Sequence, residues 1–266
     1  MKNFMPVLLV LSLSLPSFFL ADFARAETPE QTGLAVAKET NRRDDGWGDF
    51  FAQMTMLLKN RQGEESKRTI RIQNLEVAGD GDKSMSIFDH PADIKGTALL
   101  TYTHKTGDDD QWLYLPALKR VKRIASSNKS GPFMGSEFAF EDIVSQEVEK
   151  YTYKHIREEI FDGQDCFVQE RYPADKNSGY TKQMVWIDKT HYRILKIDFY
   201  DRKDALLKTL NFRGYQQYLN KYWRATEMFM ENHQSGKSTL LNWSDYKFRN
   251  GLKAGDFDQA KLQRAR

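Results

Sequence analysis

The side chains that could perform catalysis do not fall into a catalytic pattern. The five histidines are scattered, and none has the His-x-His or His-Glu-x-x-His spacing that places two imidazoles on one metal ion. Gly236-Lys237-Ser238 has the ending of a phosphate-binding loop, but Glu231 stands where that motif needs its first glycine. The segment also joins two predicted strands, so we interpret it as a hairpin turn. The sequence predicts no enzyme, no metal site and no cofactor.

The sequence has one cysteine, Cys166, and therefore no intramolecular disulfide. Because it lies between Asp165 and Phe167 without a cation that would activate its thiol, we expect it to be buried as a small apolar residue. The formal net charge of +3 over 266 residues argues against nucleic-acid binding.

A basic and aromatic constellation runs from Trp112 to Asp142. Four cations follow an aromatic strand, and a polar loop then leads to four apolar residues, Phe133, Met134, Phe138 and Phe140. One interpretation is a solvated basic strand beside an aromatic loop that plugs the end of a barrel. The other is a basic rim beside an apolar lid, which would suit a long apolar ligand because methionine repacks easily. The residues alone leave both open.

The elements that position these residues are mostly β-strands. Phe50, Ala52, Met54, Met56 and Leu58 alternate along a first strand, and Ile70, Ile72, Met85 and Ile87 mark the next two. Further strands are expected near 97–104, 111–115, 117–124, 151–161, 166–172, 180–188, 191–200, 205–213, 222–231 and 237–247. Several are apolar on both faces, which predicts a strongly curved antiparallel sheet or barrel of about eleven to twelve strands, partly covered by helices.

Three helices are expected to cover this sheet. Thr28-Pro29-Glu30-Gln31 has the pattern of a capping box and begins a helix that ends near Asp44. Phe140, Ile143, Val144 and Val148 follow helical spacing and predict a second helix over 137–149. A short third helix begins near Asp256.

The first 26 residues have the pattern of a cleavable signal peptide. Lys2 precedes an apolar stretch from Pro6 to Leu20, and Ala24-Arg25-Ala26 provides small residues for cleavage before Glu27. A membrane anchor is the rival interpretation, but the apolar stretch is short for a span. We therefore expect residues 1–26 to be removed on export and residues 27–266 to form a single domain.

The constellation resembles a hallmark of the LolA-like family, the outer-membrane lipoprotein-sorting proteins of Gram-negative bacteria. The family pattern W-x-Y-x-P-A-L-K-R-V-x-R-I is matched by Trp112, Tyr114, Pro116 to Val121 and Arg123-Ile124. The pattern F-M-G-S-[DE]-F-x-[YF]-E-D is matched from Phe133 to Phe138 and by Phe140, Glu141 and Asp142. The leader, the N-terminal helix and the succession of strands are also similar, so the resemblance covers the mature chain.

This resemblance implies an unclosed, strongly curved antiparallel β-barrel whose mouth is covered by a helical lid. It also implies a periplasmic protein that binds the acyl chains of a lipid or lipoprotein, for transport toward the outer membrane, with an inner-membrane lipid transporter as a partner. We also expect the protein to be a monomer. For the cavity wall we predict Met54, Met56, Ile70, Ile72, Met85, Leu100, Tyr102, Trp112 and Tyr114. For the lid we predict Phe133, Met134, Phe138 and Phe140, and for the docking rim Lys119, Arg120, Lys122 and Arg123.

Two functional hypotheses follow. In the first, the protein is a carrier, and burial of about 14 methylenes at ~0.8 kcal/mol each offers roughly 11 kcal/mol before the cost of ordering the chain. In the second, the protein is an adaptor that docks onto a lipid-exporting transporter through its basic segment and carries nothing. An open apolar cavity favours the carrier, and an interior filled by its own side chains favours the adaptor. A hydrolase is least favoured because no triad spacing occurs.

Overall fold

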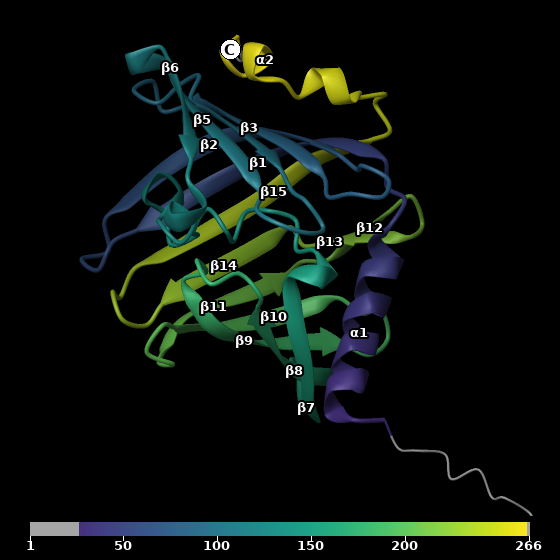
Figure 1. The fold of residues 1–266 in the computed structure, drawn as a ribbon. Helices are drawn as coiled ribbons and strands as arrows, with labels where there is room; N and C mark the ends of the chain where they lie inside the picture. The colour runs from purple at the N-terminus through teal and green to yellow at the C-terminus, as the bar shows by residue number, and fades with distance from the viewer. Residues whose placement is uncertain (1–26, 265–266) are drawn as a thin grey trace, which may run out of the picture.

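The computed structural model describes residues 27–264, and the predicted signal peptide lies outside the described residues. Most of this part forms one strongly curved antiparallel sheet, and we call the concave side of this sheet its hollow (Figure 1). Its first strands are β1 (Asp49–Lys59), β2 (Glu65–Leu75), β3 (Lys83–His90), β4 (Ala98–Tyr102), β5 (Asp110–Leu115) and β6 (Arg120–Ile124). The later strands are β7 (Tyr151–Phe161), β8 (Gln164–Pro173), β9 (Tyr180–Asp188), β10 (Ile194–Asp201), β11 (Leu206–Arg213), β12 (Gln216–Tyr218), β13 (Tyr222–Arg224), β14 (Glu227–Asn232) and β15 (Ser238–Phe248).

The sheet is unclosed, as predicted. Its thirteen strands have the order β6-β5-β4-β3-β2-β1-β15-β14-β11-β10-β9-β8-β7, so β6 and β7 remain at the two edges. Pairing of β1 with β15 joins the N-terminal meander to the C-terminal one. The predicted count of eleven to twelve strands was too low. The expected strand over 222–231 is interrupted at Ala225-Thr226 into β13 and β14, and β12 pairs with β13 in a separate ribbon.

Helix α1 (Pro29–Asp44) covers the β7 edge of the sheet. Its capping box is formed as predicted: the Gln31 amide donates to Thr28 Oγ1 over 3.2 Å, and the Thr28 amide donates to Gln31 Oε1 over 2.9 Å. Gly33 lets the helix approach the strand, since a Cβ there would lie 2.9 Å from the His155 nitrogen. No helix among residues 27–264 is long and apolar enough to cross a membrane.

The segment between β6 and β7 corrects the prediction of a helix over 137–149. It contains only short 3-10 turns, at Ser126–Asn128, Phe133–Gly135 and Val148–Lys150, and lies in the hollow of the sheet (Figure 1). Phe133 and Phe138 are each 1 % exposed, and the Phe133 ring packs 5.8 Å from that of Phe88 on β3. The apolar residues with helical spacing therefore contact the inner face of the sheet from an irregular segment. We call residues 132–142 the inner segment.

A buried ion pair anchors the inner segment. Lys208 on β11 and Asp142 have side chains that are 4 % and 2 % exposed, and Nζ lies 2.6 Å from the Asp142 carboxylate. The same carboxylate accepts hydrogen bonds from the Tyr180 hydroxyl at 2.8 Å and the Ala139 amide at 2.6 Å. Lys208 also donates to the Glu137 carbonyl oxygen at 2.8 Å. These contacts tie both ends of the Glu137–Asp142 stretch to the far half of the sheet.

The C-terminal segment packs on the outer face of the sheet. Helix α2 (Gln259–Leu262) begins after its cap Asp258 and follows a 3-10 turn at Ala254–Asp256. Phe257 and Leu262 are fully buried against Met85 and Leu100. The predicted short helix near Asp256 is confirmed in position, and it covers the convex face.

Two interpretations of single motifs are confirmed. The Gly236-Lys237-Ser238 segment is the turn between β14 and β15, where the Gly236 amide donates to the Asn232 carbonyl oxygen at 2.9 Å. Cys166 is fully buried beside Val168 and Trp186, and burial raises the pKa of its thiol.

We expect Asp142→Ala to reduce the free energy of unfolding by about 3–5 kcal/mol, because it leaves the Lys208 ammonium buried without a counter-charge. Adding Lys208→Met should restore part of this loss, which urea unfolding followed by tryptophan fluorescence would measure. The matched control is Glu65→Ala, which removes the exposed partner of Lys59 and should change stability by less than about 1 kcal/mol. Equal losses for Asp142→Ala and Glu65→Ala would show that the buried pair does not anchor the inner segment.

Candidate functional site

A cavity of about 800 Å³ lies between α1 and the inner face of the sheet. Helix α1 contributes Ala37 and Thr40, and the loop after β2 and the loop before β7 provide further wall. This volume is within the range of about 300–1,000 Å³ that is usual for ligand sites. The cavity occupies the part of the hollow that the inner segment leaves open.

Aromatic side chains form much of the cavity wall. They come from strands on both halves of the curled sheet, from the α1–β1 and β11–β12 connections and from β13 of the separate ribbon. They are Trp47, Phe50, Tyr153, Phe212, Tyr215, Trp223, Trp243 and Tyr246. Rigid rings of this kind give a large apolar contact area, which suits the body of an apolar ligand.

Four of the nine predicted cavity residues lie on the inner face but outside this cavity. Met54, Met56, Ile70 and Ile72 share that face because Met54 pairs with Ile70 across β1 and β2. They belong to the same buried core cluster as Phe133 and Phe138. This half of the hollow is filled by the protein's own side chains.

The other five predicted cavity residues lie on the outer face, which corrects their assignment. On β2 and β3, Ile70 pairs with Phe88 whereas Met85 pairs with Gln73, so Met85 points away from the inner face. Leu100 on β4 pairs with Met85, and Trp112 on β5 pairs with Leu100, so both of these side chains also face outward. Alternation within those strands then places Tyr102 and Tyr114 with them, beneath the C-terminal segment.

Because the prediction took the outer face of β3 to β5 for the inner one, it missed the residues that do occupy the inner face of these strands. These residues are Phe88, Leu99 and Leu113, all buried in the core that contains Phe133. Sequence alternation marks both sets equally, because these strands are apolar on both faces.

The four predicted lid residues lie together but do not form a helix. Phe133 and Phe138 are buried, and Met134 and Phe140 pack partly buried against the same core. The Arg68 guanidinium donates to the Met134 carbonyl oxygen, and the Phe133 and Phe140 rings lie 5.7 Å apart. Glu141, next to Asp142, accepts from the Ser178 hydroxyl at 2.7 Å and the Gly179 amide at 2.8 Å.

The four predicted docking residues lie at the free β6 edge. Arg120, Lys122 and Arg123 belong to β6, and Lys119 precedes it with a positive φ of 49° after the 3-10 turn Pro116–Leu118. All four are exposed, and Arg123 pairs with Asp110. The structure thus brings the predicted rim together on one sheet edge.

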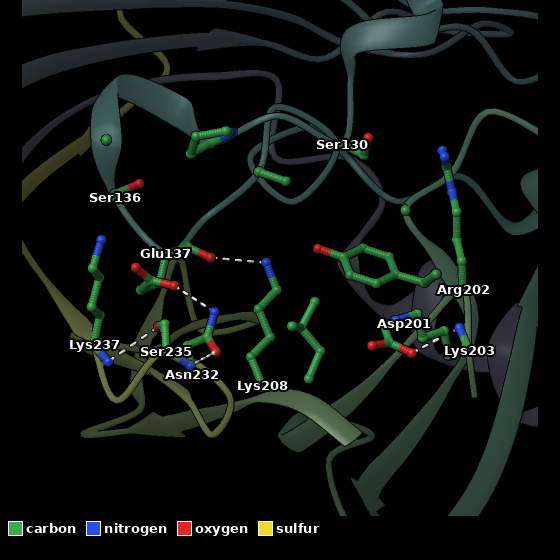
Figure 2. A pocket seen from close by; sticks show the side chains of 16 residues that line it. Ser130, Ser136, Glu137, Asp201, Arg202, Lys203, Lys208, Asn232, Ser235 and Lys237 are labelled. Carbon is green, nitrogen blue, oxygen red and sulfur yellow. Dashed lines mark hydrogen bonds between the residues drawn. The ribbon is translucent and has the colours of Figure 1, made fainter. Parts of the chain in front are cut away.

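A second pocket, of about 640 Å³, lies at the other end of the β14–β15 hairpin from the cavity. Figure 2 shows it between the inner segment and the turns that carry Asp201 to Lys203 and Asn232 to Lys237. Asn232 donates to Glu137 over 2.7 Å, and Gln234 joins the two turns by donating to Asp201 over 2.9 Å. In the second of these turns the amides of Gln234, Ser235 and Gly236 all donate to Asn232.

Two carboxylates on the loops of the α1 cavity, Asp82 and Glu147, have raised pKa values. Burial raises the pKa of Asp82 to about 6, although Ser145 donates a hydrogen bond to it at 2.9 Å. Burial also raises the pKa of Glu147, and repulsion by Asp82 adds to this effect. Asp82 is therefore partly protonated in mildly acidic solution.

Several cavity residues were not predicted from the sequence. Gln169 and Arg171 are buried on the inner face of β8, opposite Val185 and Gln183 on β9. Polar residues at every second position of a strand usually mark a solvated face, so their pattern carried no signal of a site.

Comparison with known proteins gives consistent similarities. A family model described as that of an uncharacterized protein matches residues 80–264. An outer membrane lipoprotein-sorting protein domain from Vibrio parahaemolyticus is 61% identical, with 88% of this chain and 99% of that chain covered and a TM-score of 0.87. A DUF1329 family protein from Desulfovibrio piger is 32% identical, with 89% and 100% covered and a TM-score of 0.83. A LolA superfamily protein from Nitrosomonas europaea shares the fold at 22% identity, with 89% and 100% covered and a TM-score of 0.70. No curated protein matches the chain.

Asp82 predicts a pH dependence of stability. Its pKa in the folded protein, about 6, exceeds the ordinary 3.8, so this group's stabilising contribution is present below pH 3.8 and is lost as the pH rises through about 6. Asp82→Asn keeps an acceptor for Ser145 and should match the wild type near pH 3.8. At pH 7.5 it should be more stable by about 3 kcal/mol. Urea unfolding of both proteins at each pH measures the difference, and a difference that does not change with pH would contradict the prediction.

Proposed function

This chain belongs to the LolA-like family, and we propose that it is a periplasmic carrier that holds an acyl chain of a lipid or lipoprotein in the cavity beneath α1. The observation that carries this proposal is the cavity itself, about 800 Å³ between a helix and an aromatic sheet face. The name of the 61%-identical relative, an outer membrane lipoprotein-sorting protein domain, supports the same class of cargo and a place between the two membranes.

The carrier would bind without performing chemistry. Burial of the chain against the aromatic wall would supply the free energy of capture, at about 0.8 kcal/mol per methylene. Release then requires movement of a covering element. Helix α1 is the candidate for that movement, because it packs on the sheet edge and roofs the cavity.

The inner segment has a different proposed role from that of a helical lid. Phe133, Met134, Phe138 and Phe140 would act as an apolar plug that ends the cavity on one side. Movement of this plug would join the cavity to the surface formed by Met54, Met56, Ile70 and Ile72. The Lys208–Asp142 pair opposes such movement, so we propose that the plug stays in place while α1 opens.

The adaptor remains a second candidate because one specific observation favours it. Half of the hollow is filled by the core around Phe133 and Phe138, as expected of a protein that carries nothing. In this alternative, Lys119, Arg120, Lys122 and Arg123 would dock the free β6 edge onto an acidic surface of an inner-membrane lipid transporter.

Ala37→Phe tests the carrier. Ala37 is buried on the cavity side of α1, so the added ring should occupy cavity space and weaken binding of a fluorescent acyl probe at least about tenfold. Ala35→Phe, on the exposed side of the same helix, should bind as the wild type does. If the wild-type protein binds no acyl probe and contains no co-purified lipid by native mass spectrometry, the carrier is wrong.

Charge reversal at the docking rim separates the two candidates. The double variant Arg120→Glu, Lys122→Glu should no longer bind to inner-membrane vesicles that contain their native transporters. Its binding of the acyl probe should not change. Vesicles of the extracted lipids alone provide the control for simple attraction to anionic lipid. Undiminished retention of the double variant on native vesicles would contradict a docking role for the rim.

A further inference from the structure

Arg171 is a buried cation without a carboxylate partner. It is 7 % exposed, and no carboxylate of residues 27–264 forms an ion pair with it. Its Nε donates to Gln183 Oε1 at 2.6 Å, and its guanidinium lies 4.8 Å from the centre of the Tyr151 ring. A guanidinium has five N–H donors, so one hydrogen bond leaves most of them unused. Because a buried charge is costly unless it is paired, this arrangement calls for an anion.

Gln169 stands beside Arg171 on the same face of β8. The two residues alternate with Glu170, so both point to the inner face, and both line the cavity beneath α1. Gln169 is 2 % exposed, yet its side-chain Oε1 has no hydrogen-bond partner among the described residues. An amide next to a guanidinium supplies donors to the same small acid group.

Unpartnered polar atoms gather around this one cavity. Five buried side-chain polar atoms lack a partner among the described residues, and four of them belong to Thr40, Asn74, Gln169 and Trp243, which line the cavity. Native proteins leave few such groups, and each needs an explanation. Their concentration in one cavity is what a site for a partly polar ligand requires.

The residues paired with Arg171 on the two neighbouring strands carry no charge. Across the sheet it faces Tyr153 on β7 and Gln183 on β9, both neutral. Asp82 and Glu147 of the cavity wall lie on loops, and Asp44 at the end of α1 pairs with Arg224, the other arginine of the wall. Lys105 also lines the cavity but is only partly buried, so an acid group that enters the cavity meets in Arg171 a buried cation that has no ion pair among residues 27–264.

We propose that the cavity binds a single-chain amphiphile head first, with a carboxylate or phosphate on the Arg171 guanidinium and the Gln169 amide. The planar guanidinium can meet such an acid group with two parallel N–H donors. The tail then lies along the aromatic wall toward α1. This inference rests on the proposed carrier function and names its cargo: a chain with a free acid end, in place of an acyl chain whose carboxyl group is esterified.

Competition against a fluorescent acyl probe tests the proposal, with dodecanoate, dodecyl phosphate, dodecanol and inorganic phosphate as competitors. In the wild type, at least one of the two acids should compete at least about tenfold better than dodecanol, and whichever is preferred identifies the acid group. Arg171→Met should abolish this preference and leave dodecanol unchanged. Arg224→Met, the matched control in the same cavity, should keep the preference.

The outcomes separate the inference from the proposed function. If dodecanol competes as well as both acids do, the acid site is wrong and the carrier stands. If no tailed compound competes and the probe itself does not bind, the carrier is wrong. Competition by inorganic phosphate alone would assign the site to a free anion and overturn the inference. If Arg171→Met does not fold, Gln169→Leu and Arg171→Lys provide the test, and each should reduce the preference for the acid.

Discussion

The buried ion pair between Lys208 and Asp142 determines how the hollow of the sheet is divided. Desolvation makes such a pair a weak source of net stability, but removal of either partner is expensive, so the pair specifies position. Asp142 is also held by the Tyr180 hydroxyl and the Ala139 amide, and Lys208 reaches the Glu137 carbonyl oxygen. These contacts keep Phe133 and Phe138 against β3 and the strands beside it, and they leave the space beneath α1 open.

The division gives the two ends of the curled sheet different roles. One end is a dry core in which methionine, isoleucine and phenylalanine side chains fill the interior. The other end is a cavity whose wall combines aromatic rings with unpartnered polar groups. Helix α1 roofs this cavity and covers a sheet edge at the same time, because Gly33 allows it to lie against β7. Helix α1 therefore both protects the β7 edge of the sheet and limits the entry of a ligand into the cavity.

The fold alone does not decide the ligand. A LolA superfamily protein shares this fold at 22% identity, a level at which the side chains of a cavity can differ entirely. The argument for a cargo rests on particular side chains instead. Aromatic rings favour an apolar body, and the unpaired Arg171 beside Gln169 favours an acid end, so the two halves of an amphiphile each have a place.

The sequence by itself determined the local structure and the family. Alternation located most strands to within a few residues, the Thr28 capping box located α1, and the run from Trp112 to Asp142 identified the LolA-like family.

The tertiary structure decided which face of each strand is inner. Met85 and Trp112 alternate as clearly as Ile70 and Met54, and only the register across β2 and β3 shows that they face outward. It also decided the state of residues 137–149, where contacts from Lys208, Tyr180 and Ser178 overrode helical spacing. The inner face of each strand and the conformation of residues 137–149 have the same physical cause. Contacts between residues far apart in the sequence decide which side chains of a strand face inward and what shape an anchored loop takes, and the local sequence pattern holds no information on these contacts.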